Sequence, residues 1–305
     1  MKFGVFSVSM PEYTVEETVN ILKELGYNGV EWRVTEIDPE AMAGAFGENL
    51  TDEQRFEYRY WLDNKSTLDV NNIMEEAKRV KAICDEAGIS IFGLSTYLNT
   101  DKYDELVEVY RAAQATDIPM VRVGLVNLES SFEKEKRHVR DLNQKMRSEL
   151  ERLVDLSKET GVKTVIEMHM GTLIASPSAA YNMLKGLDPK YIGVIVDPGN
   201  MAKEGYEEYR KAFELLGDYI AHVHMKNGRY IEKEERNAVG AKTWDYVWTP
   251  LKDGQADLLR VFEVMKELGY DHTVSVEDFS NEQDTYEKLK DNLAYLKTCY
   301  DFVRQ

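Results

Sequence analysis

The sequence has few cysteines and no long apolar run, and both shortages narrow the kind of protein it can encode. Its two cysteines, Cys84 and Cys299, lie in segments with helical patterning and have no CxxC or CxH companion. They are expected to be small buried hydrophobic residues rather than a disulfide or a metal site. No window reaches the roughly 18 consecutive apolar residues that a membrane span requires. The opening MKFGVFSVSM also lacks the charged, apolar and small-residue order of a signal peptide, so a cytoplasmic protein with no membrane partner is expected.

Basic residues and histidine are scarce too. Lysine and arginine total 38 against 55 aspartates and glutamates, which gives a formal net charge of −17. A chain with this balance repels phosphate groups and anionic lipid and attracts cations, so a nucleic-acid partner is not expected. The five histidines limit the number of imidazole metal ligands that any site could use.

The glycine motifs of nucleotide-binding folds are missing, because no GxGxxG follows a candidate strand and no GxxxxGK[ST] occurs. The sequence instead contains eight short apolar runs rich in β-branched residues, separated by longer amphipathic segments. The apolar runs span residues 3–9, 29–34, 90–95, 120–125, 164–169, 193–197, 220–226 and 273–278. The helical patterns span residues 14–25, 71–87, 102–116, 135–160, 177–187, 206–216, 255–268 and 284–300. This alternation predicts a parallel sheet, and eight units in about 300 residues favour a closed (β/α)₈ TIM barrel.

Two connections are longer than a bare barrel requires. Residues 35–70, after the second strand, contain RFEYRYW (55–61), which is expected on an extra helix. Residues 227–254, after the seventh strand, contain TWDYVWTP (243–250). Neither is rich in Gly, Ser or Pro, so residues 1–305 are expected to form a single domain with two insertions. Because both insertions follow strands, both are expected at the C-terminal face, where barrel active sites lie.

Four of the apolar strands carry an ionisable side chain near the C-terminal end. These residues are Glu167, Asp197, His224 and Glu277. Carboxylates gathered there without a cation would be costly by several kcal/mol and would take up protons. Three carboxylates and one imidazole suit one divalent ion, with Mn²⁺ expected and Mg²⁺, Co²⁺ or Zn²⁺ as alternatives. The competing interpretation is a set of ion pairs with Arg33, Arg122 and Lys226.

The strand IAHVHMK places His222 and His224 two residues apart, and residues two apart in a strand share a face. His224 lies nearer the C-terminal end and is the predicted ligand. His222 is expected one layer deeper, as a neutral core histidine bonded to a neighbour. Glu31 and Trp32 point to opposite faces, and their order in the sequence does not say which of them faces the barrel interior.

The ordered motifs VIEMH, VDPGN, HVHMKN and SVED resemble the sugar phosphate isomerase/epimerase group of the xylose isomerase-like TIM barrels. The resemblance covers nearly the whole chain except the two insertions. It implies Glu167, Asp197, His224 and Glu277 as metal ligands, with Glu167 and Glu277 also moving protons. Asn200 stands where ketose 3-epimerases of the group have a histidine.

Five residues are predicted to contact substrate: His169, Asn200, Lys226, Arg229 and Trp244. His169 and Lys226 lie two residues beyond a predicted ligand and are expected on the same inward face. Arg229 matches a position where the group's epimerases place an arginine that contacts sugar. Trp244, with its neighbours Tyr246 and Trp248, is interpreted either as a stacking surface or lid for a sugar or as packing against another subunit.

The predicted chemistry is removal of a proton from the carbon next to a carbonyl of a sugar or polyol derivative, through an enediolate. Return of the proton gives an epimerase or isomerase. Loss of a β-substituent gives a lyase, either an inosose-type dehydratase or an enzyme that eliminates a C-linked aglycone. An AP-endonuclease-type phosphodiesterase is less favoured, because such enzymes need more histidine ligands and a less acidic surface. A barrel without catalysis of its own, and association into a homo-oligomer, remain alternatives.

Overall fold

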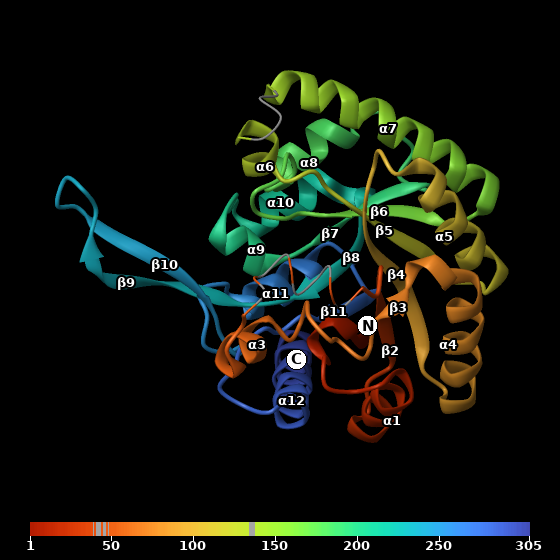
Figure 1. Cartoon of the computed structure of the whole chain (residues 1–305), viewed down its shortest axis with the longest axis horizontal. Coiled ribbons are helices and arrows are strands. Elements are labelled where there is room, and N and C mark those ends of the chain that lie inside the picture. The colour runs from red at the N-terminus through yellow and green to blue at the C-terminus, as the bar shows by residue number, and fades with distance from the viewer. Residues whose placement is uncertain (39, 41–43, 45–46, 48, 134–137) are drawn as a thin grey trace.

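The computed structural model is a closed barrel of eight parallel strands surrounded by helices (Figure 1). The strands are β1 (Lys2–Phe6), β2 (Gly29–Thr35), β4 (Ser90–Asn99), β5 (Met120–Gly124), β6 (Lys163–Glu167), β7 (Ile192–Val196), β8 (Ile220–Met225) and β11 (Thr273–Val276). They pair in the order β1-β11-β8-β7-β6-β5-β4-β2, and pairing of β1 with β2 closes the barrel. The predicted TIM barrel is therefore confirmed, with a strand at each of the eight apolar runs.

The structure describes residues 1–38, 40, 44, 47, 49–133 and 138–305. Parts of the first predicted insertion and the start of the helix predicted at 135–160 lie outside these residues. The helices that follow the strands are α1 (Val15–Leu25), α4 (Ile73–Ala87), α5 (Tyr103–Ala115), α7 (Val139–Thr160), α8 (Pro177–Leu184), α10 (Tyr209–Leu216), α11 (Leu258–Glu267) and α12 (Thr285–Arg304). Short helices α3 (Asp52–Tyr58), α6 (Leu128–Glu133) and α9 (Pro198–Lys203) lie between them. Within the described ranges, none of these helices combines the length and the apolar content needed to cross a bilayer.

Local sequence signals explain where α1 begins and ends. The Thr14 hydroxyl accepts a hydrogen bond from the Glu17 amide, and the Glu17 carboxylate accepts one from the Thr14 amide, which together form a capping box. The helix ends at Gly26, whose φ of 85° is a left-handed conformation that glycine adopts without strain. The same kind of ending precedes other strands, so these glycines determine where each helix stops and the chain returns to the barrel.

The floor of the barrel is filled from inside by Phe92 of β4. Phe92 packs with Met120, Val165 and Ile195 in a small internal cluster. A Cβ added to Gly29 of β2 would lie 2.2 Å from the Phe92 ring, so the neighbouring strand carries glycine there because the ring needs the space. These side chains pack the lower interior of the barrel, and barrel active sites form above it, at the C-terminal ends of the strands.

The second insertion forms a long antiparallel hairpin of β9 (Gly228–Arg236) and β10 (Lys242–Trp248), which projects from the barrel (Figure 1). The tip of the hairpin is exposed to solvent, and Val239 there is 86% exposed. Its root is held by the buried Asn227, whose amide donates to the carbonyls of Leu251 (2.7 Å) and Ala256 (2.9 Å). The Asn227 side-chain oxygen accepts from the amides of Gly228 and Ala256, both at 2.9 Å. All four hydrogen-bonding positions of this side chain are used.

We expect Asn227→Ala to lower the free energy of unfolding by about 3 kcal/mol, because buried backbone groups at the hairpin root lose their partners. Urea denaturation followed by circular dichroism measures this. The matched control is Asn237→Ala at the exposed tip, where the Asn237 side chain accepts hydrogen bonds from two backbone amides. A loss within about 0.5 kcal/mol is expected for the control. Equal losses in the two variants would contradict the role given to Asn227.

Candidate active site

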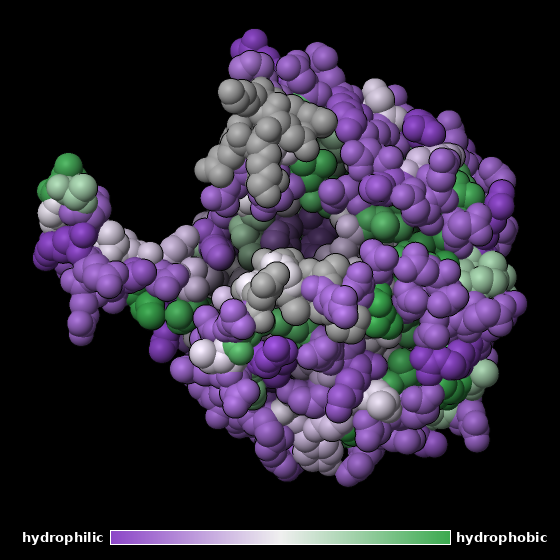
Figure 2. All heavy atoms as spheres, viewed as in Figure 1, coloured by the Kyte–Doolittle hydropathy of each residue, from purple (hydrophilic) through white to green (hydrophobic). Residues whose placement is uncertain are grey.

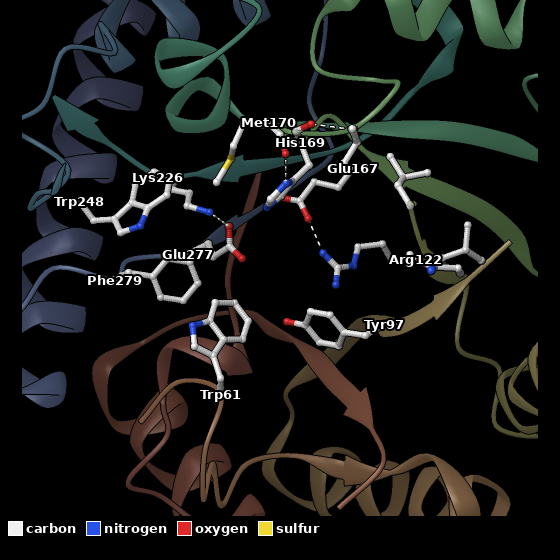
Figure 3. Close-up of a pocket in the computed structure, with 15 residues that line it drawn as sticks. Trp61, Tyr97, Arg122, Glu167, His169, Met170, Lys226, Trp248, Glu277 and Phe279 are labelled. Atoms are coloured by element: carbon white, nitrogen blue, oxygen red, sulfur yellow. Dashed lines mark hydrogen bonds and ion pairs between the residues drawn. The ribbon is translucent and has the colours of Figure 1, made fainter. Parts of the chain in front are cut away.

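A cavity of about 440 Å³ opens at the C-terminal ends of the strands. Figure 2 shows it as a hollow near the middle of the face drawn in Figure 1. Its lining comes from strand ends and from both insertions, and includes Glu167, His169, Lys226, Trp248 and Glu277 (Figure 3). This is the face on which barrel enzymes build their active sites.

The structure brings the four predicted metal ligands together. Glu167 ends β6, Asp197 follows β7, His224 lies in β8 and Glu277 follows β11, and one ligand atom from each lies within 4.8 Å of all the others. All four side chains are buried. The His224 Nδ1 atom is 3.5 Å from a Glu167 oxygen and 3.6 Å from a Glu277 oxygen. The strand pairing therefore sets all four side chains at one height inside the barrel.

The sequence VDPGN explains how Asp197 is aimed. One Asp197 oxygen accepts from the amide of Asn200 at 2.9 Å and thereby caps α9, with Pro198 in the first helical position. A Cβ on Gly199 would lie 2.8 Å from the Lys226 carbonyl, so glycine lets α9 approach β8. The other oxygen, Oδ2, is buried and has no hydrogen-bond partner among the residues that the structure describes. The cap thus leaves one carboxylate oxygen directed at the cluster.

His224 is oriented by Glu31, which faces the barrel interior from β2. The His224 Nε2 atom donates to the Glu31 carboxylate at 2.8 Å, and the Phe6 ring stacks on the imidazole with centroids 5.5 Å apart. The Nδ1 atom is buried without a hydrogen-bond partner and points toward the acids. A carboxylate behind a ligating histidine fixes its tautomer and increases its basicity. Glu31 is a positioning residue whose inward direction the sequence left undecided.

Within the described residues, two atoms of the cluster have no hydrogen-bond partner: Asp197 Oδ2 and His224 Nδ1. The charges around these atoms explain why a cation fits there. Burial, together with the charges of Glu277 and Glu167, raises the pKa of Asp197 well above its usual value. Burial alone would lower the pKa of His224, but Glu31 and the two ligand glutamates outweigh it and raise that pKa. Both shifts favour the protonated form of the group, and a divalent ion would relieve the same repulsion.

The competing interpretation, ion pairing with strand cations, is also realised for the two glutamates. The Arg122 guanidinium pairs with Glu167, and Lys226 Nζ lies 2.8 Å from a Glu277 oxygen. Burial raises the pKa of Glu167, but Arg122 and His224 together outweigh it and bring the pKa well below its usual value. Lys226 is 3.8 Å from Asp197 Oδ2, which is beyond hydrogen-bond distance. The cations thus balance the glutamates and leave Asp197 and His224 available to a metal.

A family model described as the xylose isomerase-like TIM barrel matches residues 19–299. The chain belongs to this family. An inosose dehydratase from Lacticaseibacillus casei is 26% identical over 273 residues, which is 83% of this chain and 89% of the relative. The solved structure of 3-keto-D-glucoside 4-epimerase from E. coli has a TM-score of 0.68 at 16% identity, over 98% of this chain and all of the other. A family member from Mycobacterium smegmatis, solved in complex with magnesium, has a TM-score of 0.63 at 16% identity over 99% and 97% of the two chains. The first two relatives bear the names of enzymes, and the two solved structures share the fold of this chain.

Three of the predicted substrate contacts lie in the cavity or directly behind its lining. His169 lines the cavity, and its Nδ1 atom donates to the Met170 carbonyl at 2.8 Å, which leaves Nε2 as the acceptor of the neutral ring. Burial lowers the pKa of His169. Lys226 lines the cavity beside Glu277. Asn200 is buried behind Glu167, and its side-chain amide donates to the Glu167 carboxylate at 2.9 Å, so Asn200 orients that carboxylate.

The other two predicted contacts are not brought to the cavity. Arg229 and Trp244 lie on the projecting hairpin, where both are exposed and neither lines the cavity. The family resemblance suggested Arg229 and the aromatic character of the segment suggested Trp244, but the hairpin carries both side chains outward. His222 lies deeper, as predicted, bonded through its two nitrogens to the hydroxyls of Thr273 and Ser275, both at 2.8 Å.

Several cavity residues were not singled out from the sequence, among them Tyr97, Trp61 and Phe279. Tyr97 lies in β4, with the Arg122 guanidinium 4.8 Å from its ring centroid. Phe279 lies two residues after Glu277, and that spacing was a usable signal because alternate strand residues share a face. Trp61 comes from the first insertion, and no local sequence pattern predicts that this residue reaches the cavity.

We expect Glu31→Gln to weaken Mn²⁺ binding about tenfold or more, because the neutral amide no longer supports the His224 imidazole. Isothermal titration calorimetry of metal-stripped protein measures the affinity. The matched control is Glu149→Gln on α7, where the Glu149 carboxylate accepts from the Thr100 hydroxyl at 2.6 Å on the outer surface of the barrel. An unchanged affinity in Glu31→Gln would remove the role assigned to that carboxylate.

Mn²⁺ binding near neutral pH should release about one or two protons, because Asp197 and His224 have raised pKa values in the metal-free protein and must lose their protons to ligate an ion. The sign follows from this: the apparent affinity increases with pH between about pH 6 and pH 8. Titrations in buffers of different ionisation enthalpy give the proton number. An apparent enthalpy that is the same in every buffer would show that these groups are already deprotonated.

Proposed function

We propose that this protein is a divalent-metal-dependent enzyme that removes a proton from the carbon next to a carbonyl of a sugar or polyol derivative. The observation that carries the proposal is the placement of Glu167 and Glu277 in one buried cluster on the wall of the same cavity. Glu167, Asp197, His224 and Glu277 would hold the ion, and Mn²⁺ is the expected one. Once bound, the ion would polarise the substrate carbonyl as a Lewis acid.

The chain's own residues supply the proton transfers. Glu277 and Glu167 lie on different sides of the cavity opening, from β11 and β6 (Figure 3). Burial raises the pKa of Glu277, but the Lys226 ammonium and His224 together outweigh it and lower that pKa. Arg122 and Asn200 hold Glu167 in place. Epimerisation needs one of these carboxylates ionised, to remove a proton from one face of the carbon, and the other protonated, to deliver a proton to the opposite face.

A lyase is the second candidate, and two observations favour it. The inosose dehydratase relative aligns over most of both chains. In addition, Lys226 is placed to protonate a departing hydroxyl, since its ammonium lines the cavity beside Glu277, and the free Nε2 atom of His169 can accept a hydrogen bond from the substrate. Elimination and epimerisation share the first proton removal, so the two candidates differ only in the fate of the resulting enediolate.

The test is solvent exchange in D₂O with Mn²⁺-loaded protein and a panel of ketoses and inososes. We expect deuterium at the carbon next to the carbonyl of at least one compound, measured by NMR and mass spectrometry. Glu167→Gln and Glu277→Gln should each slow this exchange by about 10²–10⁴-fold, while Glu149→Gln should leave it unchanged. A product lighter by one water identifies a dehydratase, and an inverted centre identifies an epimerase. Absence of exchange across the panel, with metal bound, would contradict the proposal.

A further inference from the structure

Four aromatic side chains form one continuous side of the cavity, which we call the aromatic wall: Trp61, Tyr97, Trp248 and Phe279. They come from four separate segments. Trp61 belongs to the first insertion and Trp248 to the end of the hairpin in the second. Both segments that a bare barrel would not need therefore deliver a tryptophan to the same surface.

Ring contacts hold the aromatic wall in a fixed shape. Trp61 meets Tyr97 edge-on at 6.1 Å between centroids and lies 5.4 Å from Phe279. Trp248 meets Phe279 at 6.1 Å, and the buried Tyr60 supports Phe279 from behind at 4.9 Å. Edge-to-face contacts of this kind are favourable and directional. The wall is therefore built before any ligand arrives.

The aromatic wall stands across the cavity from Glu167 and His169 (Figure 3). Lys226 marks the boundary between the two regions, because its Nζ atom lies 4.3 Å from the Trp248 ring centroid and 2.8 Å from a Glu277 oxygen. One end of a ligand would thus meet acids and cations, and the other end would meet ring faces and edges. A cavity of about 440 Å³ falls within the range of pockets that hold drug-sized ligands.

We propose that the aromatic wall binds an apolar, aryl-type substituent carried by the sugar or polyol, while the acid cluster takes the oxygenated ring. This inference rests on the proposed function for the identity of the oxygenated part. A bare polyol presents hydroxyls around its whole edge and would leave many of them facing rings that offer few hydrogen-bond partners. An aryl group needs no such partners and buries apolar area against the wall.

The alternative role for these rings is to stack on the C–H face of an unsubstituted sugar. The two roles predict different affinities for matched glycosides. Stacking on the sugar ring alone makes methyl and phenyl glycosides bind equally, whereas an aryl subsite favours the phenyl compound.

The experiment compares methyl and phenyl β-D-glucopyranoside, and the corresponding xylosides, as binding probes for the full chain with Mn²⁺. Neither probe has a carbonyl, so neither is turned over by the proposed chemistry. Calorimetry and saturation-transfer NMR should give about tenfold or tighter binding for the phenyl compound of at least one pair. Trp61→Ala and Trp248→Ala should reduce that ratio to near one.

Trp244→Ala is the matched control, because Trp244 lies on the same hairpin as Trp248 but outside the cavity, with a 55% exposed side chain. It should keep the full phenyl preference. Trp61→Phe and Trp248→Phe retain a ring and should keep part of the preference, which separates loss of the wall from loss of folding. Equal binding of both members of every pair, no binding of either up to millimolar concentration, or an unchanged ratio in the alanine variants overturns the proposal.

The outcome is separable from that of the solvent-exchange test. Phenyl preference without any deuterium exchange would leave the aromatic wall as a binding surface and remove the proposed chemistry. Deuterium exchange without phenyl preference would support the proposed chemistry and remove the aryl-binding role of the aromatic wall.

Discussion

Mutual repulsion among buried carboxylates is the constraint around which the mouth of this barrel is organised. Glu167, Asp197 and Glu277 would not share a space whose ligand atoms lie within 4.8 Å of one another unless positive charge were supplied. Arg122 and Lys226 supply part of it, and each is buried against a glutamate. Asp197 has no such cation within hydrogen-bond distance, which explains why the chemistry of the site points to a divalent ion.

The interior below the cluster is arranged in layers that serve it. Phe92 closes the floor, and His222 lies above it with both nitrogens bonded to hydroxyls. Glu31 forms the next level and accepts from His224, which in turn faces the acids. The two imidazoles of β8 share a face because one belongs to the packed interior and the other to the reactive surface. Each layer restricts the rotamer of the one above, as a preorganised site requires.

Much of this could be predicted from local sequence. β-Branched runs located the strands, and an acid or histidine at a strand's end located the cluster, because parallel strands in a barrel finish at one edge. It was harder to predict which side chains of a strand face the barrel interior and which face the helices. Alternation shows that Glu31 and Trp32 face opposite ways, but only packing against α4, where Trp32 lies near the buried Cys84, decides which is outside. Trp244 and Trp248 have the same parity in β10, yet only the one nearest the hairpin root reaches the cavity. How far β10 extends from the barrel depends on its pairing with β9, and no local sequence pattern specifies that pairing.

In the described part of the chain, the two insertions each place a tryptophan at the cavity, and neither carries any of the four clustered residues. The four clustered residues lie in or directly after barrel strands, whose replacement would disturb the whole cylinder, whereas Trp61 and Trp248 lie on insertions that a bare barrel does not need. Changes in the insertions can therefore alter substrate selectivity without altering the clustered residues. A swap of these two segments between members of the family would therefore transplant ligand preference onto an untouched reaction centre.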